Sequence, residues 1–220
     1  MYSSKLQWCK AISRRFSLAT TDRRKGMIFL EHHEKETSQE KWQERVLKTR
    51  SIIISGEITQ AVAEKVMGQL LILEDMGDQP IKLFINSQGG HVEAGDTIHD
   101  MIKFIKPRVI VIGTGWVASA GITIYLAAAK ENRYSLPNTR YMIHQPLGGV
   151  QGQASDIRIE ADEIIKMRSR INKLISDGTG QPLAKIEKDT QRNYWLGAQE
   201  AIEYGIVNQI ITKSIDLKDL

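Results

Sequence analysis

Three short stretches of the sequence carry the residue types that acyl transfer at a serine requires. Ser119 lies among small residues in 115–121, His144 is followed by Gln-Pro, and Gly89 and Gly90 are adjacent. A serine becomes a nucleophile only with a base beside it and with N–H donors for the developing oxyanion. A neutral imidazole serves as such a base, and adjacent glycines let the backbone turn its N–H groups toward a ligand. Together the stretches predict a serine nucleophile, if the fold brings them to one place.

Each stretch alone also has a structural interpretation. A serine before a helix is more often an N-cap, adjacent glycines often form a tight turn, and a lone histidine is more often structural. Two familiar motifs are missing from the sequence. No Gly-Lys-Ser/Thr follows the glycines, and Val117 takes the place of the first glycine in the G-x-S-x-G elbow of the α/β-hydrolases. The choice between the catalytic and the structural interpretation therefore depends on the elements that position these residues.

Apolar runs alternate with helical patterns along the chain. β-Branched runs are expected as strands and amphipathic stretches as helices, which gives strands at 51–55, 81–85 and 108–113 and helices at 60–74, 93–105 and about 119–130. This rhythm predicts an α/β fold of βαβ units on a parallel sheet, where ligands bind at the carboxyl ends of the strands. Ser119, the loop 86–92 and His144, which follows a strand-like Tyr-Met-Ile, all fall at such ends.

The second half of the chain has a different pattern. A Gly- and Gln-rich connector, 147–153, leads into a long helical stretch at about 154–176. The single apolar stripe of this stretch needs a partner, which is either its own domain or a neighbouring subunit. The elements expected to follow are helices at about 182–190 and 198–204 and a strand at 206–212.

Composition and charge narrow the class of protein. The chain has 220 residues, 41% of them hydrophobic, which suits one globular domain. No apolar run approaches the roughly 18 residues of a membrane span, and a single cysteine fits a reducing compartment. The net charge of +4 comes from residues 1–26, which hold seven cationic residues and one acidic residue. The rest has a net charge of −2 without a basic, aromatic stripe, which argues against a nucleic-acid partner.

The first 50 residues are expected to lie outside the domain. Residues 1–30 are interpreted as a leader that is disordered or removed from the mature protein. Residues 1–26 are rich in Arg and Ser, which is typical of an organellar transit peptide, but a disordered tail or an upstream start before Met27 explains them as well. Residues 31–50 are highly charged and are expected to form a mobile segment and a short helix. Their adjacent histidines lack further ligands at metal-binding spacing, so we predict no metal site.

Several motifs occur in the order found in one known family. They are N-S-Q-G-G at 86–90, G-W-V-A-S-A-G at 115–121, M-I-H-Q-P-L-G-G at 142–149 and G-A-Q-E-A-I-E-Y-G at 197–205. On these motifs the chain resembles ClpP, the caseinolytic serine peptidase subunit, from about residue 42 to 212. The resemblance implies a ClpP/crotonase-like fold of repeated ββα/βαβ units, with a peptidase domain at 51–220. It also implies a protruding handle helix, with the handle at about 147–177.

The resemblance also implies an assembly and its partners. Members of this family form heptameric rings that stack in pairs as a tetradecamer around a closed chamber, where the handles interleave. An AAA+ unfoldase, which uses ATP, feeds unfolded proteins into the chamber. No cofactor or metal is implied for this chain itself, and neither nucleic acid nor a membrane is an expected partner. The expected location is cytoplasmic, or an organelle if residues 1–26 are a transit peptide.

The family's catalytic positions carry over with one departure. Ser119 matches the nucleophile, His144 matches the base, and the N–H groups of Gly90 and Ala120 match the oxyanion hole. Asn193 stands where the family has the aspartate of a D-T-x-R-D motif. An asparagine accepts the imidazole N–H but supplies no charge, and the Asp-to-Asn change in a serine protease costs about 10⁴ in rate through the wrong tautomer. We therefore expect a weakened site.

Two further departures concern assembly. Gln191 replaces an acidic residue that usually forms a ring–ring contact with an arginine, whereas Arg192 is kept. One exposed ion pair contributes about 0–1 kcal/mol, but a ring repeats its loss in every subunit. Lys82 lies where the docking groove often carries an aromatic residue, although Phe84 is kept, and charged residues replace the usual hydrophobic N-terminal segment. Direct docking of an unfoldase on this ring is therefore in doubt.

Three functional hypotheses follow. The first is a serine endopeptidase subunit that is attenuated alone and works in a mixed complex with a full-triad ClpP paralogue. The second is a non-catalytic structural ring subunit of the same complex, although an abandoned site need not keep both Ser119 and His144. The third is a crotonase-type acyl-CoA enzyme, which would share the fold but generally uses carboxylates, and the handle motif argues against it.

Overall fold

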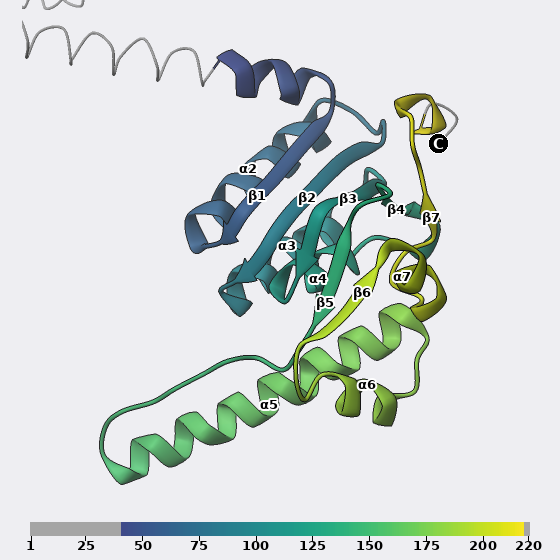
Figure 1. The fold of residues 1–220 in the computed structure, drawn as a ribbon. Helices are drawn as coiled ribbons and strands as arrows, with labels where there is room; N and C mark the ends of the chain where they lie inside the picture. The colour runs from purple at the N-terminus through teal and green to yellow at the C-terminus, as the bar shows by residue number, and fades with distance from the viewer. Residues whose placement is uncertain (1–40, 218–220) are drawn as a thin grey trace, which may run out of the picture. The chain divides into compact units, whose positions relative to one another are not determined.

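The structure is a computed structural model that describes residues 41–217, and a mainly parallel seven-stranded sheet organises them (Figure 1). Five parallel strands form the main path of the sheet, in the order β1 (Ser51–Ile58), β2 (Ile81–Gly90), β3 (Val109–Ala118), β4 (Arg133–Ser135) and β7 (Gln209–Ile210). Two further strands lie off this path, because β5 (Arg140–Ile143) pairs parallel with β3 and antiparallel with β6 (Tyr194–Gly197).

Helices follow the strands as βαβ units require. Their bounds are α2 (Gln60–Asp75), α3 (Val92–Phe104), α4 (Ala120–Tyr125), α5 (Ala154–Thr179), α6 (Leu183–Asp189) and α7 (Ala198–Tyr204). Residues 41–48 are also helical, and short 3-10 turns occur at Lys130–Asn132 and Ser214–Leu217. The predicted apolar faces of α2 and α3 are buried in the main core, with Val66, Leu70 and Ile98 among them. The predicted α/β class and the parallel sheet are thus confirmed.

Several element boundaries differ from the prediction. The stretch 86–92 is not a loop throughout, because β2 continues to Gly90 and pairs there with Ile58. β3 is longer than predicted and ends at Ala118, directly before Ser119. The helix expected at about 119–130 ends at Tyr125, and the closing strand is only Gln209–Ile210. The short strands β4 and β6 were not predicted.

The long helix α5 extends away from the sheet, and residues 144–153 run beside it (Figure 1). Only its carboxyl-terminal half is anchored, since Ile171 and Ile175 are buried in the core whereas Ile157 and Ile165 are exposed. A Cβ atom at Gly148 would lie 2.8 Å from the Ile164 side chain, so the connector packs tightly on the helix. The protruding helix predicted for this region is confirmed, and its outer half has exposed apolar side chains in the single chain, with Ile157, Ile159 and Ile165 among them.

Arg133 ties the anchored end of α5 to α4. Its guanidinium donates hydrogen bonds to the carbonyls of Leu126 at 3.2 Å, Ala128 at 2.8 Å and Gly178 at 2.6 Å. These carbonyls lie at or just beyond the carboxyl ends of the two helices, where a cation is favourable. Burial lowers the pKa of Arg133, but three carbonyl acceptors satisfy the buried charge.

Most predictions for the amino-terminal segment concern residues outside the described range. They are the leader at 1–30, the transit-peptide interpretation of 1–26, the alternative start at Met27 and the adjacent histidines. By internal contacts the chain divides into residues 1–44 and 45–220. Within 41–217, no group of three or more His, Cys, Asp and Glu side chains is arranged to hold a metal ion, and no helix there is long and apolar enough to cross a membrane.

Candidate active site

Ser119 occupies a strained turn between β3 and α4. Its φ of 55° and ψ of −122° are unusual for a residue other than glycine. Its side chain does not cap the helix, which removes the structural interpretation of this serine as an N-cap. The turn is held in place because the Ser119 N–H donates to the carbonyl of Met142 at 2.9 Å, on the neighbouring strand β5. Such strain persists only where the surroundings enforce it, and it is common at functional sites.

Strand register brings His144 and Asn193 to this turn. Ala118 pairs with Met142 in the β3–β5 ladder, so the chain that follows β5 passes beside Ser119. Ile143 pairs with Tyr194 in the antiparallel β5–β6 ladder, so His144 and Asn193 are the next facing pair. Three separate segments therefore meet at one end of the sheet, as expected for the carboxyl ends of parallel strands.

The three side chains form a hydrogen-bonded series. The Ser119 Oγ lies 2.7 Å from Nε2 of His144, and Nδ1 of His144 lies 3.0 Å from Oδ1 of Asn193. Because a carbonyl oxygen only accepts, Nδ1 carries the proton and Nε2 is free to accept from the serine hydroxyl. This is the tautomer that a general base requires, and the asparagine supplies it without a charge.

The end of β2 lies against Ser119. A Cβ atom added at Gly89 would lie 2.5 Å from the Ser119 Cβ, and the Gly89 φ of +98° also favours glycine. The next N–H along the chain, that of His91, donates to Ile58 of β1 at 2.8 Å. Gly90 ends β2 and pairs with Ile58 of β1, and its φ of +154° again favours glycine. Ala120 opens α4, so its N–H has no partner within the helix.

A small pocket adjoins the serine. Its lining is mostly apolar and includes Ser119 and His144. The other lining residues are Val92, Ala120, Ile122, Thr123, Ile143, Pro146, Ile171 and Ile175. Thr123 uses its hydroxyl internally, because Oγ1 donates to the carbonyl of Ala120 at 2.7 Å. The volume of the pocket in the single chain is about 20 Å³, which is room for about one water molecule and not for a substrate side chain.

A second set of contacts supports the segment that carries Asn193. Asp189, at the end of α6, accepts hydrogen bonds from the Tyr204 hydroxyl at 2.7 Å and from Lys185 at 2.5 Å. Burial alone would raise the pKa of Asp189, but these two donors outweigh it and hold the pKa below its ordinary value. The pKa of Tyr204 is raised, mainly because the hydroxyl is buried and also because it donates a hydrogen bond to Asp189. The aspartate is thus fixed as a carboxylate that links α6 to α7.

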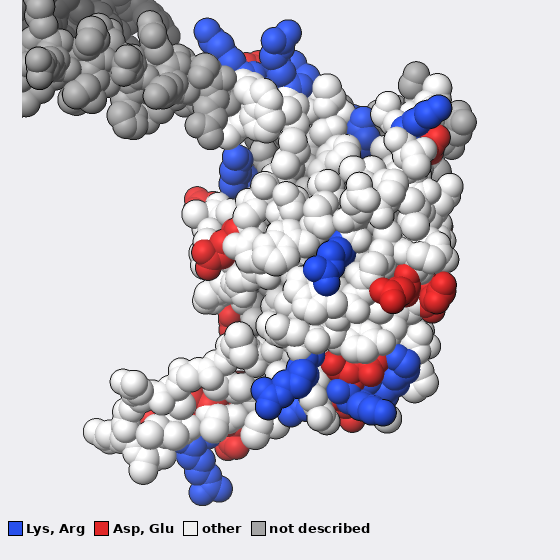
Figure 2. Space-filling model, in the orientation of Figure 1, with Lys and Arg blue, Asp and Glu red and all other residues white. Residues whose placement is uncertain are grey.

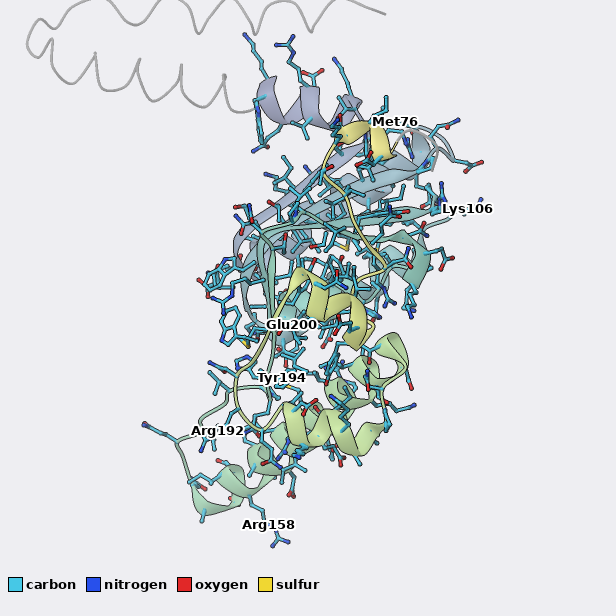
Figure 3. All side chains as sticks on the ribbon, turned by 45° about the vertical axis from the view of Figure 1, so that its right-hand side comes forward. Met76, Lys106, Arg158, Arg192, Tyr194 and Glu200 are labelled. Atoms are coloured by element: carbon cyan, nitrogen blue, oxygen red, sulfur yellow. The ribbon has the colours of Figure 1, made fainter. Side chains whose placement is uncertain are left out.

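The residues predicted for assembly lie near the site or on the sheet surface. Gln191 and Arg192 are exposed, and Figure 3 labels Arg192 beside Tyr194 at the start of β6. Lys82 is half-buried on β2, and Phe84 packs against a second apolar cluster that includes Tyr134. Figure 2 shows one face of the molecule as mostly uncharged, with one basic side chain near its middle and side chains of both signs around it.

Without the family resemblance, the sequence patterns identify neither Asn193 nor the residues that hold its segment in place. Asn193 precedes a four-residue strand that has no readable periodicity, so pattern alone gave no signal for it. Thr190, which is buried and donates to Asn172 at 3.0 Å, was not singled out either. The sequence did place Ser119, His144 and the glycine pair at strand ends, and the structure brings these together.

The fold and this series of serine, imidazole and amide define an α/β protein with the site of a serine hydrolase. Comparison with known proteins gives the family. The Clp protease family model matches residues 33–214. The proteolytic subunit 3 of the ATP-dependent Clp protease of Rhizobium meliloti is 59% identical over 172 residues, which cover 78% of this chain and 88% of that protein. The proteolytic subunit 2 of the ATP-dependent Clp protease of Pseudomonas aeruginosa is 51% identical over 177 residues, which cover 80% of this chain and 88% of that protein.

Solved structures agree with this assignment. ClpP1 of Listeria monocytogenes is 63% identical and matches with a TM-score of 0.73, covering 80% of this chain and 99% of that one. A variant of the same protein, with an asparagine replaced by aspartate, matches with a TM-score of 0.75 at the same identity and coverage. The chain therefore belongs to the Clp protease family and is a Clp-type serine peptidase subunit.

Proposed function

We propose that this chain is an endopeptidase subunit that cleaves unfolded proteins to short peptides through Ser119, His144 and Asn193, with low activity alone. The observation that carries the proposal is the hydrogen-bonded series from Ser119 Oγ through His144 to Asn193 Oδ1, at 2.7 and 3.0 Å. His144 Nε2 takes the serine proton as Oγ attacks the substrate carbonyl, and later gives that proton to the leaving amine. The N–H groups of Gly90 and Ala120 stabilise the oxyanion.

The neutral third residue limits the rate in this proposal. An imidazolium forms beside Asn193 during the attack, and an amide oxygen stabilises it less than a carboxylate would. The correct tautomer is still favoured, so the site is weakened rather than abolished. A full-triad ClpP paralogue in a mixed ring assembly would restore turnover by holding this loop and by carrying the unfoldase.

The names of the relatives support an ATP-dependent assembly, since two of them are proteolytic subunits of ATP-dependent Clp proteases. We propose heptameric rings, stacked as a tetradecamer alone or with the paralogue, in the cytoplasm. ATP would be used only by a partner AAA+ unfoldase. The uncovered apolar residues on the outer half of α5, with Ile157 and Ile165 among them, support contact with an opposite ring. The exposed Gln191 and Arg192 would face the same ring–ring contact.

The alternative is a non-catalytic structural ring subunit of the same complex. Both functions predict a mixed complex, so the test is a Ser119→Ala variant within that complex, assayed with a fluorogenic peptide that the paralogue alone cleaves poorly. Loss of that cleavage is expected. Unchanged cleavage by an assembly of unchanged mass would contradict a catalytic role and leave the structural one.

A further inference from the structure

Gln145 joins the segment of His144 to the segment of Asn193 by two hydrogen bonds. Its backbone N–H donates to the carbonyl of Thr190 at 2.6 Å, and its side-chain Nε2 donates to the carbonyl of Gln191 at 3.0 Å. One residue thus holds two consecutive carbonyls of the loop that leads into Asn193. Neither bond involves the three residues of the hydrogen-bonded series.

The loop needs such a hold because its own packing is slight. Thr190 is buried and donates to Asn172 at 3.0 Å, and β6 begins at Tyr194, but the residues between them are exposed. The β5–β6 ladder ends at the pair Ile143–Tyr194. Beyond it, Gln145 bonds to Thr190, so the loop side is two residues longer than its partner segment. The Gln145 side chain contacts this longer segment through its hydrogen bond to the Gln191 carbonyl.

A neutral asparagine depends on the position of its loop more than an aspartate would. Only the Oδ1 end of its amide accepts the Nδ1–H of His144, whereas the Nδ2 end would donate and favour the other tautomer. In that other tautomer Nε2 carries the proton and cannot take one from Ser119. A carboxylate has two equivalent oxygens and a charge, so a rotation of its side chain does not reverse the imidazole.

We infer that Gln145 is a positioning residue, which holds the loop so that Asn193 presents its oxygen to His144. The inference rests on the proposed function, because it acts through Asn193 and gives Gln145 no contact with the substrate. The asparagine form of the site thus depends on a hydrogen bond outside the triad, from the Gln145 side chain to the Gln191 carbonyl, which we call the clamp. Removal of the clamp therefore lowers the fraction of molecules that hold the base in its productive tautomer.

The test is a double-mutant cycle on the rate at which a fluorophosphonate probe labels Ser119, followed by intact mass on the assembled protein. Gln145→Met keeps the length and loses the donor, and Gln199→Met is the matched control on α7. In the parent, Gln145→Met should slow labelling about fivefold, the factor expected for one net hydrogen bond, and Gln199→Met should not change it. In an Asn193→Ala background, Gln145→Met should have no further effect, because Gln145 acts only through Asn193.

Three outcomes would overturn the inference. Labelling of Gln145→Met at the parent rate would show that the clamp does not matter. Equal slowing in the Asn193→Ala background would show a general structural role. Failure of Ser119 to label in the parent, both alone and in the mixed assembly, would remove the proposed function and the inference with it. Should Gln145→Met not fold, Gln145→Ala retains the backbone bond to Thr190 and replaces it in the cycle.

Discussion

Replacement of Asn193 by aspartate should raise the rate of peptide cleavage. The oxygen that now lies 3.0 Å from Nδ1 of His144 would carry part of a negative charge next to the imidazolium that forms during attack. At a separation of ~4 Å, such a pair is worth about 4 kcal/mol at an effective dielectric constant near 20 and about 1 kcal/mol in water. Because Asn193 is exposed in the single chain, we expect about 2 kcal/mol, which is roughly thirtyfold in rate.

The assay is kcat/KM on a fluorogenic peptide, with the mass of the assembly measured in the same samples. Asn208→Asp is the matched control, because it adds the same charge at an exposed position outside the site. The increase should stay below about 10⁴, since the asparagine already supplies the correct tautomer. If Asn193→Asp is as slow as the parent while the assembly is unchanged, the third residue does not limit turnover and the reasoning is refuted.

Two further predictions concern the support of the site. Gly89→Ala places a Cβ 2.5 Å from the Ser119 Cβ, so we expect a folded protein, checked by circular dichroism, with labelling of Ser119 lost; normal labelling would contradict the predicted contact. Tyr204→Phe removes a donor to Asp189 and should destabilise the protein by about 1 kcal/mol at pH 7 in urea unfolding. Because the Asp189 pKa is held below its ordinary value of 3.8, this difference should be full above about pH 4 and shrink as the pH falls through the lower folded pKa; a constant difference would argue against it.

The parts of the fold that sequence predicts well are those with many residues in a regular pattern. The apolar spacing of α2 and α3 predicted both helices to within two residues at each end, and Val66, Leu70 and Ile98 are buried as expected. The βαβ rhythm is readable because apolar residues that become buried in β1 and β2, such as Ile52 and Leu83, recur between the helical stretches. The fold class follows from that rhythm alone.

The parts that sequence does not predict depend on contacts between distant segments. β4 and β6 have three and four residues, too few for a period to appear. The two glycines at the end of β2 have two separate reasons, which are visible only in three dimensions. Ser119 lies close to Gly89, and the backbone of Ile58 lies close to Gly90. Asn193 was found through the family motif, whereas the hold of Gln145 on its loop has no sequence signal beyond its place next to His144.

In the proposed function, Ser119 acts as a nucleophile that His144 activates, and peptide mapping after reaction with a fluorophosphonate probe tests this most directly. We expect one adduct, on the peptide that contains Ser119, formed at least in the mixed assembly and lost in a His144→Ala variant. An adduct that forms equally fast without the imidazole, or none on Ser119 in either assembly, would contradict it.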